Sequence, residues 1–170
     1  WLLEHRELLI KYGIYYPNHI LDSNGVSSGN ALALFETPKS KIKDARQKKP
    51  ILIEEARKHK CRTLLLSSES FMRRLPVLAR LFPKANFIGY VRPPYELLES
   101  GYNQRVKQGG EVDKFKLEQA KKINHLKKFG PMISEIGAEK FTLRPYEPSI
   151  FFKNDIICDF LETLIPKFNN

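Results

Sequence analysis

An arginine and a serine in the middle of the chain have the types and spacing that phosphate binding requires. Arg92 follows an apolar run at residues 86–91 (NFIGYV), and Ser100 comes eight residues after Arg92. A helix that starts after Arg92 would place Ser100 roughly two turns from the end of the strand. A guanidinium binds two phosphate oxygens as a fork, and a hydroxyl supplies a third hydrogen bond. We therefore predict that Arg92 and Ser100 close on one phosphate from two sides.

A second candidate loop follows another apolar run, at residues 62–67 (RTLLLS), and contains Ser68 and Glu69. A carboxylate in this place could accept a proton, and the hydroxyl could touch a ligand. A serine followed by an acid is also ordinary chemistry for a helix start, because the hydroxyl caps free N–H groups and the acid interacts with the helix dipole. Both interpretations of Ser68 and Glu69 stay open from the sequence.

Three further residues are candidates for a base or a ligand contact. His19 lies in a loop bounded by proline and is either a base or a plain loop histidine. Arg144 and Tyr146 follow a third apolar run and could reach a ligand there, or could belong to a turn that Pro145 and the next proline hold in place. His, Cys and acidic side chains do not recur at metal-ligand spacing, so we predict no metal site.

The elements that must position these residues alternate between short, nearly all-apolar strands and helices. This order is typical of an α/β fold with a parallel sheet covered on both faces, whose ligands bind beyond the carboxyl ends of the strands. We predict one domain over residues 1–170. The predicted strands are residues 14–16, 62–67, 86–91 and 140–143. The predicted helices are residues 1–12, 31–36, 68–82, 95–108, 114–128, 131–136 and 155–165.

Residues 64–104 (LLLSSESFMRRLPVLARLFPKANFIGYVRPPYELLESGYNQ) resemble the PAPS-dependent sulfotransferase family, and residues 143–147 (LRPYE) resemble a late strand of its bacterial members. The resemblance implies a central, mostly parallel sheet flanked by helices, of the P-loop NTPase-like sulfotransferase type. It also implies transfer of a sulfuryl group from 3′-phosphoadenosine 5′-phosphosulfate (PAPS) to a hydroxyl or amine. Arg92 and Ser100 would bind the 3′-phosphate of PAPS.

The same resemblance places the family's catalytic base at the end of the strand before Arg92, where Glu69 is the ionisable residue; His19 is the alternative base. Ser68, Arg144 and Tyr146 are the further candidates for contact with PAPS. One part of the family pattern is missing from the chain. Residues 23–30 (SNGVSSGN) contain glycine and serine but no Lys or Arg. We expect the first strand and the 5′-phosphosulfate loop upstream of Trp1; otherwise the chain does not bind the donor.

The charge of the chain predicts an anionic partner. The 170 residues carry a formal charge of +10, and residues 39–62 hold ten basic side chains against three acids. Such a run is usually a solvated face, but it could also line an acceptor cleft and attract an acidic glycan. Two other functions stay open: a phosphotransferase of related fold, and a non-catalytic module that binds polyanions or nucleic acid. We do not expect nucleic acid as a partner, because aromatic side chains are not interleaved with these basic ones.

The sequence also bears on where the protein is located. No apolar run approaches the ~20 residues of a membrane span. No signal or transit peptide is visible either, and we expect a bacterial cytoplasmic protein.

Overall fold

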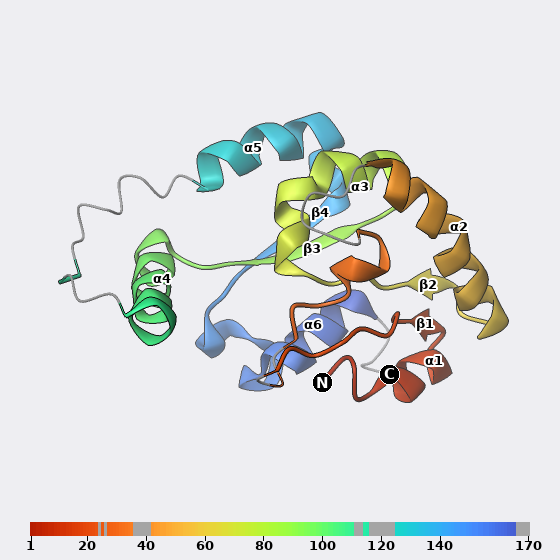
Figure 1. Ribbon diagram of the computed structural model, residues 1–170, viewed down its shortest axis with the longest axis horizontal. Helices are drawn as coiled ribbons and strands as arrows, with labels where there is room; N and C mark the ends of the chain where they lie inside the picture. Colours follow the sequence, from red (N-terminus) through yellow and green to blue (C-terminus); the bar gives the residue numbers. More distant parts are fainter. Residues whose placement is uncertain (24, 26, 36–41, 111–113, 116–124, 166–170) are drawn as a thin grey trace. The chain divides into compact units, whose positions relative to one another are not determined.

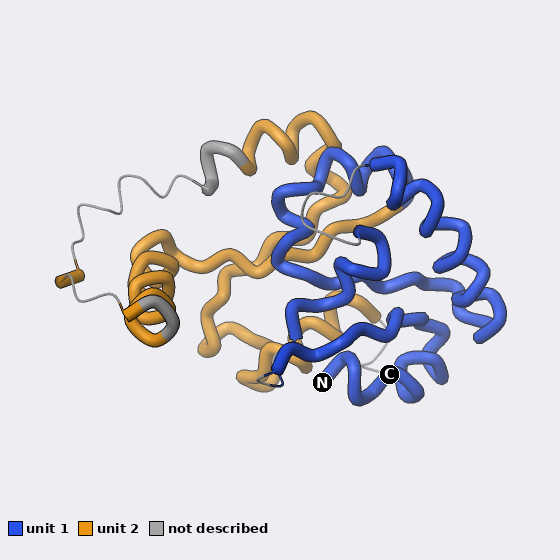
Figure 2. The backbone as a smooth tube through the Cα atoms, in the orientation of Figure 1, with its two compact units in different colours: residues 1–84 blue, residues 85–170 orange. Residues whose placement is uncertain are grey.

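A computed structural model describes residues 1–23, 25, 27–35, 42–110, 114–115 and 125–165. The chain forms two compact units, residues 1–84 and 85–170 (Figure 2). The mixed α/β class is confirmed, and the strands of the described residues pair in parallel. They do so in two separate two-stranded sheets, one within each unit (Figure 1). One central sheet, a P-loop-like fold and a single domain stay predictions.

The first unit pairs β1 with β2 in the register Ile14↔Thr63 and Tyr15↔Leu64. Its core is apolar: Leu9, Leu34 and Phe35 are among the side chains with almost no exposed surface. The elements of this unit are α1 (Arg6–Lys11), β1 (Ile14–Tyr15), η1 (Ala31–Ala33), α2 (Ile42–Lys58), β2 (Thr63–Leu64), η2 (Glu69–Arg74) and α3 (Leu75–Leu81).

Several elements of this unit differ from the prediction. The helix predicted at residues 1–12 covers only Arg6–Lys11, and the helix predicted at 31–36 is a 3-10 helix over Ala31–Ala33. The basic run contains the long helix α2, which buries Ala45, Leu52 and Ala56 at helical spacing and passes through Pro50. The helix predicted at 68–82 is a 3-10 helix followed by α3, because Pro76 lies in the first turn of α3, where a missing N–H costs no hydrogen bond. The strand predicted at 62–67 shortens to two residues.

The second unit pairs β3 with β4 over five residues, from Phe87↔Phe141 to Val91↔Pro145. Phe129 of α5 packs edge-on against Phe141, with ring centroids 6.2 Å apart. The elements of this unit are β3 (Phe87–Val91), α4 (Pro94–Gly109), α5 (His125–Ile136), η4 (Ala138–Lys140), β4 (Phe141–Pro145), η5 (Pro148–Ile150), η6 (Phe152–Asn154) and α6 (Ile156–Leu164).

One helix boundary in this unit is wrong in the prediction. Separate helices were expected over residues 114–128 and 131–136, but α5 runs without a break through Pro131. The proline removes one backbone hydrogen bond, and packing of the apolar face of α5 outweighs that loss. Most of the predicted helix at 114–128 lies outside the described residues.

Candidate functional site

The carboxyl end of the β3–β4 pair brings Arg92 and Tyr146 together. Parallel strands end at the same edge, and the ladder continues past the last pair, because the Tyr146 N–H donates to the Val91 carbonyl at 2.8 Å. The central carbon of the Arg92 guanidinium lies 4.1 Å from the centroid of the Tyr146 ring. A cation over an aromatic face gains about 0.5–1 kcal/mol at an exposed site and more when it is shielded from water.

Arg92 has no carboxylate partner among the described residues. It is a half-buried cation, and its contact with Tyr146 leaves the hydrogen-bonding capacity of the guanidinium for a ligand. This is the arrangement that the predicted phosphate site needs.

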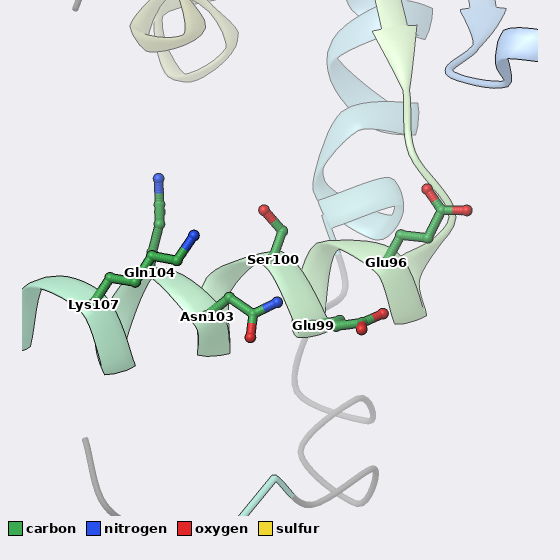
Figure 3. A pocket seen from close by; sticks show the side chains of 6 residues that line it. All are labelled: Glu96, Glu99, Ser100, Asn103, Gln104 and Lys107. Atoms are coloured by element: carbon green, nitrogen blue, oxygen red, sulfur yellow. The ribbon is translucent and has the colours of Figure 1, made fainter. Parts of the chain in front are cut away.

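Ser100 lies on the half-buried side of α4, beside a shallow hollow of about 340 Å³. Figure 3 shows the Ser100 hydroxyl pointing outward from the helix, with Glu96 one turn before it and Gln104 one turn after it. Arg92 does not line this hollow, and no contact joins Arg92 to Ser100 within the described part of the chain. The hollow is lined by Glu96, Glu99, Ser100, Asn103, Gln104 and Lys107.

The two glutamates oppose an anion at Ser100. Their carboxylates line the same hollow as the hydroxyl, and like charges at this range disfavour a phosphate by Coulomb repulsion, even where water screens part of it. Lys107 lines the same hollow and supplies one positive charge against these two negative ones. Because Arg92 does not line this hollow, a phosphate site shared by Arg92 and Ser100 stays a prediction.

Arg144 is engaged inside the unit. Its guanidinium makes a fork with Asp159: Nε donates to Oδ2 at 2.6 Å and Nη2 donates to Oδ1 at 2.7 Å. About a third of the Arg144 side chain is exposed, whereas Asp159 is 1% exposed. Arg144 is thus placed as the partner of a buried acid, and its predicted contact with PAPS stays a prediction.

Asp159 is a buried carboxylate with several hydrogen-bond donors around it, and the sequence prediction missed it. Its carboxylate also accepts hydrogen bonds from the Tyr90 hydroxyl at 2.7 Å and from the Phe152 N–H at 2.9 Å. Burial acts to raise the pKa of Asp159, but the bonds from Phe152, Tyr90 and Arg144 outweigh burial and hold that pKa below its ordinary value. Burial and the bond to Asp159 raise the pKa of Tyr90. The sequence signal for it is an acid within the apolar run of residues 155–165, because a charge that is buried with such a run is stable only when other groups pair with it.

In the first unit, the candidate loops meet beyond the carboxyl ends of β1 and β2. Asn30 joins them: its N–H donates to the Ser67 carbonyl, its side-chain oxygen accepts from the Ser67 N–H, and its amide nitrogen donates to the Leu65 carbonyl. The Ser68 hydroxyl donates to the Ser28 carbonyl at 2.8 Å and accepts from the Ser70 N–H. Ser68 is therefore the cap of η2.

Glu69 and His19 occupy different settings in this loop cluster. Glu69 is exposed in the first turn of η2, as its structural interpretation predicts. The His19 ring lies edge-on to Tyr16, and its Nε2 is 2.6 Å from the Ser27 hydroxyl oxygen. Its Nδ1 is buried and has no hydrogen-bond partner among the residues that the structure describes. A catalytic role stays a prediction for each of them.

The glycine at position 29 is required for the approach of these two loops. Gly29 has a φ of +76°, and a Cβ there would overlap the Ser67 carbonyl. We expect Gly29→Ala to lower the free energy of unfolding by about 2 kcal/mol, from backbone strain plus the overlap. Gly25→Ala is the matched control, since Gly25 has a φ of +73° and open space around it. Urea unfolding should show about half that loss for Gly25→Ala. Equal losses in the two variants would show that the overlap has no effect.

Several basic side chains of residues 39–62 already have partners within the protein. Within α2, Arg57 pairs with Glu54 and Lys58 with Glu55. Lys49 donates to the Leu81 carbonyl. Lys39 and Lys41 lie outside the described residues.

Comparison of the chain with protein-family models, with curated proteins and with solved structures found no match. Function therefore has to be argued from the sites themselves. In the described part of the chain, no helix is both long enough and apolar enough to span a bilayer. In the same residues, no three His, Cys, Asp or Glu side chains gather as metal ligands would.

Proposed function

We propose that this chain is a sulfotransferase domain that binds PAPS and transfers its sulfuryl group to an acceptor hydroxyl or amine. One observation carries the proposal: the half-buried Arg92, without a carboxylate partner among the described residues, at the carboxyl end of β3. Strand ends of this kind are where α/β proteins bind nucleotides, and a guanidinium suits a phosphate monoester. The resemblance of residues 64–104 to sulfotransferases supplies the identity of the nucleotide.

In this proposal, some of the candidate residues bind the donor and others accept the proton of the acceptor. Arg92 and Ser100 would hold the 3′-phosphate, away from the bond that breaks. Glu69 would accept the proton of the acceptor, and its exposure leaves it open to a substrate. His19 is the alternative base, although its Nε2 already faces Ser27.

A polyanion-binding module stays the second candidate, because residues 39–62 keep an excess of positive charge after the acids of their ion pairs are counted. The acceptor is proposed from the charge of the same segment. An acidic glycan would suit the remaining exposed cations of α2, such as Lys43 and Arg46.

Calorimetric titration tests the proposal with two nucleotides, adenosine 3′,5′-bisphosphate and adenosine 5′-monophosphate. We expect the bisphosphate to bind at least ~30-fold more tightly, since charge-assisted bonds to a phosphate contribute ~2 kcal/mol. Raising the salt concentration should weaken this binding only slightly. Equal affinities for the two nucleotides would contradict the proposed 3′-phosphate site. A steep salt dependence without nucleotide preference would favour the polyanion module instead.

A further inference from the structure

The Arg92 guanidinium rests on a side chain that the rest of the unit holds in place. Tyr146 contributes the ring beneath the cation, and its backbone is fixed by the bond from its N–H to the Val91 carbonyl. The Tyr146 ring itself lies edge-on to Phe151, with centroids 5.6 Å apart and planes at 81°. Phe151 is 6% exposed, so the ring that supports Tyr146 belongs to the core of this unit.

Phe151 is fixed in turn from two sides. Its ring also contacts Tyr90 edge-on at 5.8 Å. The Tyr90 hydroxyl and the N–H of Phe152, the residue after Phe151, both donate to the buried Asp159. A continuous set of contacts therefore runs from Asp159 through Phe151 to Tyr146 and ends under Arg92. Such a set restricts where the Tyr146 ring can lie, and the ring restricts the guanidinium.

We infer that Tyr146 is a positioning residue: its ring holds the Arg92 guanidinium in the orientation that receives the ligand phosphate. This inference rests on the proposed function, and it gives Tyr146 a role different from direct contact with the nucleotide. An arginine side chain has many rotamers, and binding a ligand with a free arginine requires most of them to be lost. Orienting the guanidinium beforehand removes part of that entropy cost from the binding step.

The orientation of the Arg92 guanidinium also determines which ligands bind more tightly. A ring under the guanidinium does not use its in-plane N–H groups, so the fork stays available for two oxygens of one phosphate. Loss of the ring should therefore weaken ligands that carry the 3′-phosphate. Ligands without that phosphate should bind as before.

A double-mutant cycle on the full chain tests the inference, with the bisphosphate and monophosphate of adenosine as probes. We expect Tyr146→Leu to weaken the bisphosphate about tenfold and to leave the monophosphate within about twofold. Tyr146→Phe keeps the ring and should restore the affinity to within about twofold of the wild type. In the Arg92→Ala background, Tyr146→Leu should have no additional effect on either nucleotide.

A second readout needs no ligand. The Tyr146 ring current should shift the Arg92 Nε–H resonance in NMR spectra of the free protein, and Tyr146→Leu should abolish that shift while Tyr146→Phe keeps it. An unchanged Arg92 Nε–H resonance in Tyr146→Leu would overturn the inference. It would also be overturned if Tyr146→Leu lowered the affinity for the bisphosphate equally with and without Arg92, because the ring would then contact the nucleotide directly. Failure of the proposed function looks different: the wild type would not distinguish the two nucleotides, whether or not the ring-current shift is present.

Discussion

Arg92→Ala is expected to weaken binding of adenosine 3′,5′-bisphosphate about 30-fold, which corresponds to about 2 kcal/mol. The physical reason is the loss of a half-buried guanidinium that has no carboxylate partner among the described residues and is therefore free to bind a phosphate as a fork. Affinity for adenosine 5′-monophosphate should change little. Isothermal calorimetry with both nucleotides measures the two effects.

Two variants complete the Arg92 experiment. Arg92→Lys keeps the positive charge but loses the fork, so we expect it to lose about tenfold in affinity for the bisphosphate. Arg80→Ala removes the same charge from an exposed position on α3 and should stay within about twofold of the wild type. If Arg80→Ala weakened binding as much as Arg92→Ala, the overall charge of the protein, and not a site at β3, would attract the ligand.

Asp159→Ala is expected to lower the free energy of unfolding by about 4 kcal/mol. The carboxylate is 1% exposed and accepts hydrogen bonds from Tyr90, from Arg144 and from the Phe152 N–H. Its removal leaves these donors without their acceptor and opens a gap beside α6. Urea unfolding at neutral pH measures the loss. Glu135→Ala, which removes an exposed acid from α5, is the control and should change stability by less than about 0.5 kcal/mol.

The effect of Asp159 should also depend on pH. The pKa of its carboxyl in the folded protein is held below the ordinary value of 3.8. A lowered folded-state pKa adds stability that is complete above the unfolded-state pKa and is lost as the pH falls through the folded-state pKa. The stability difference between wild type and Asp159→Ala should therefore be constant near neutral pH and shrink below about pH 4. A difference that grows in acid would contradict this role.

Local patterns were sufficient to predict the positions of several candidate residues. The apolar run before Arg92 forms β3, and the run before Tyr146 forms β4, because short stretches of buried side chains favour strands. Parallel pairing followed from the alternation of strands and helices. These two features place Arg92 and Tyr146 at one edge of a sheet, although the contact between them was not predicted.

Long-range partners could not be predicted in the same way. The bond from Tyr90 to Asp159 joins residues 69 positions apart, and the bonds of Asn30 to Leu65 and Ser67 span 35 and 37 positions. No local pattern specifies such pairs, so the sequence left Arg144 open between a ligand contact and a turn and did not indicate the bonds of Asn30. Gly29 is a similar case, because only the close approach of the Ser67 carbonyl shows why a side chain cannot replace its hydrogen.

The separation of the contacts into two units has a consequence for folding during synthesis. Every pairing of β1 with β2 lies within residues 1–84, so the ribosome completes all of these partners while the second half of the chain is still unmade. β3 stays unpaired for longer, because its partner strand β4 follows much later in the chain and Asp159, the buried acid of α6, lies 69 positions after Tyr90. Nascent chains therefore expose the apolar face of β3 until β4 has been made, and we expect chaperones to bind this strand in that interval.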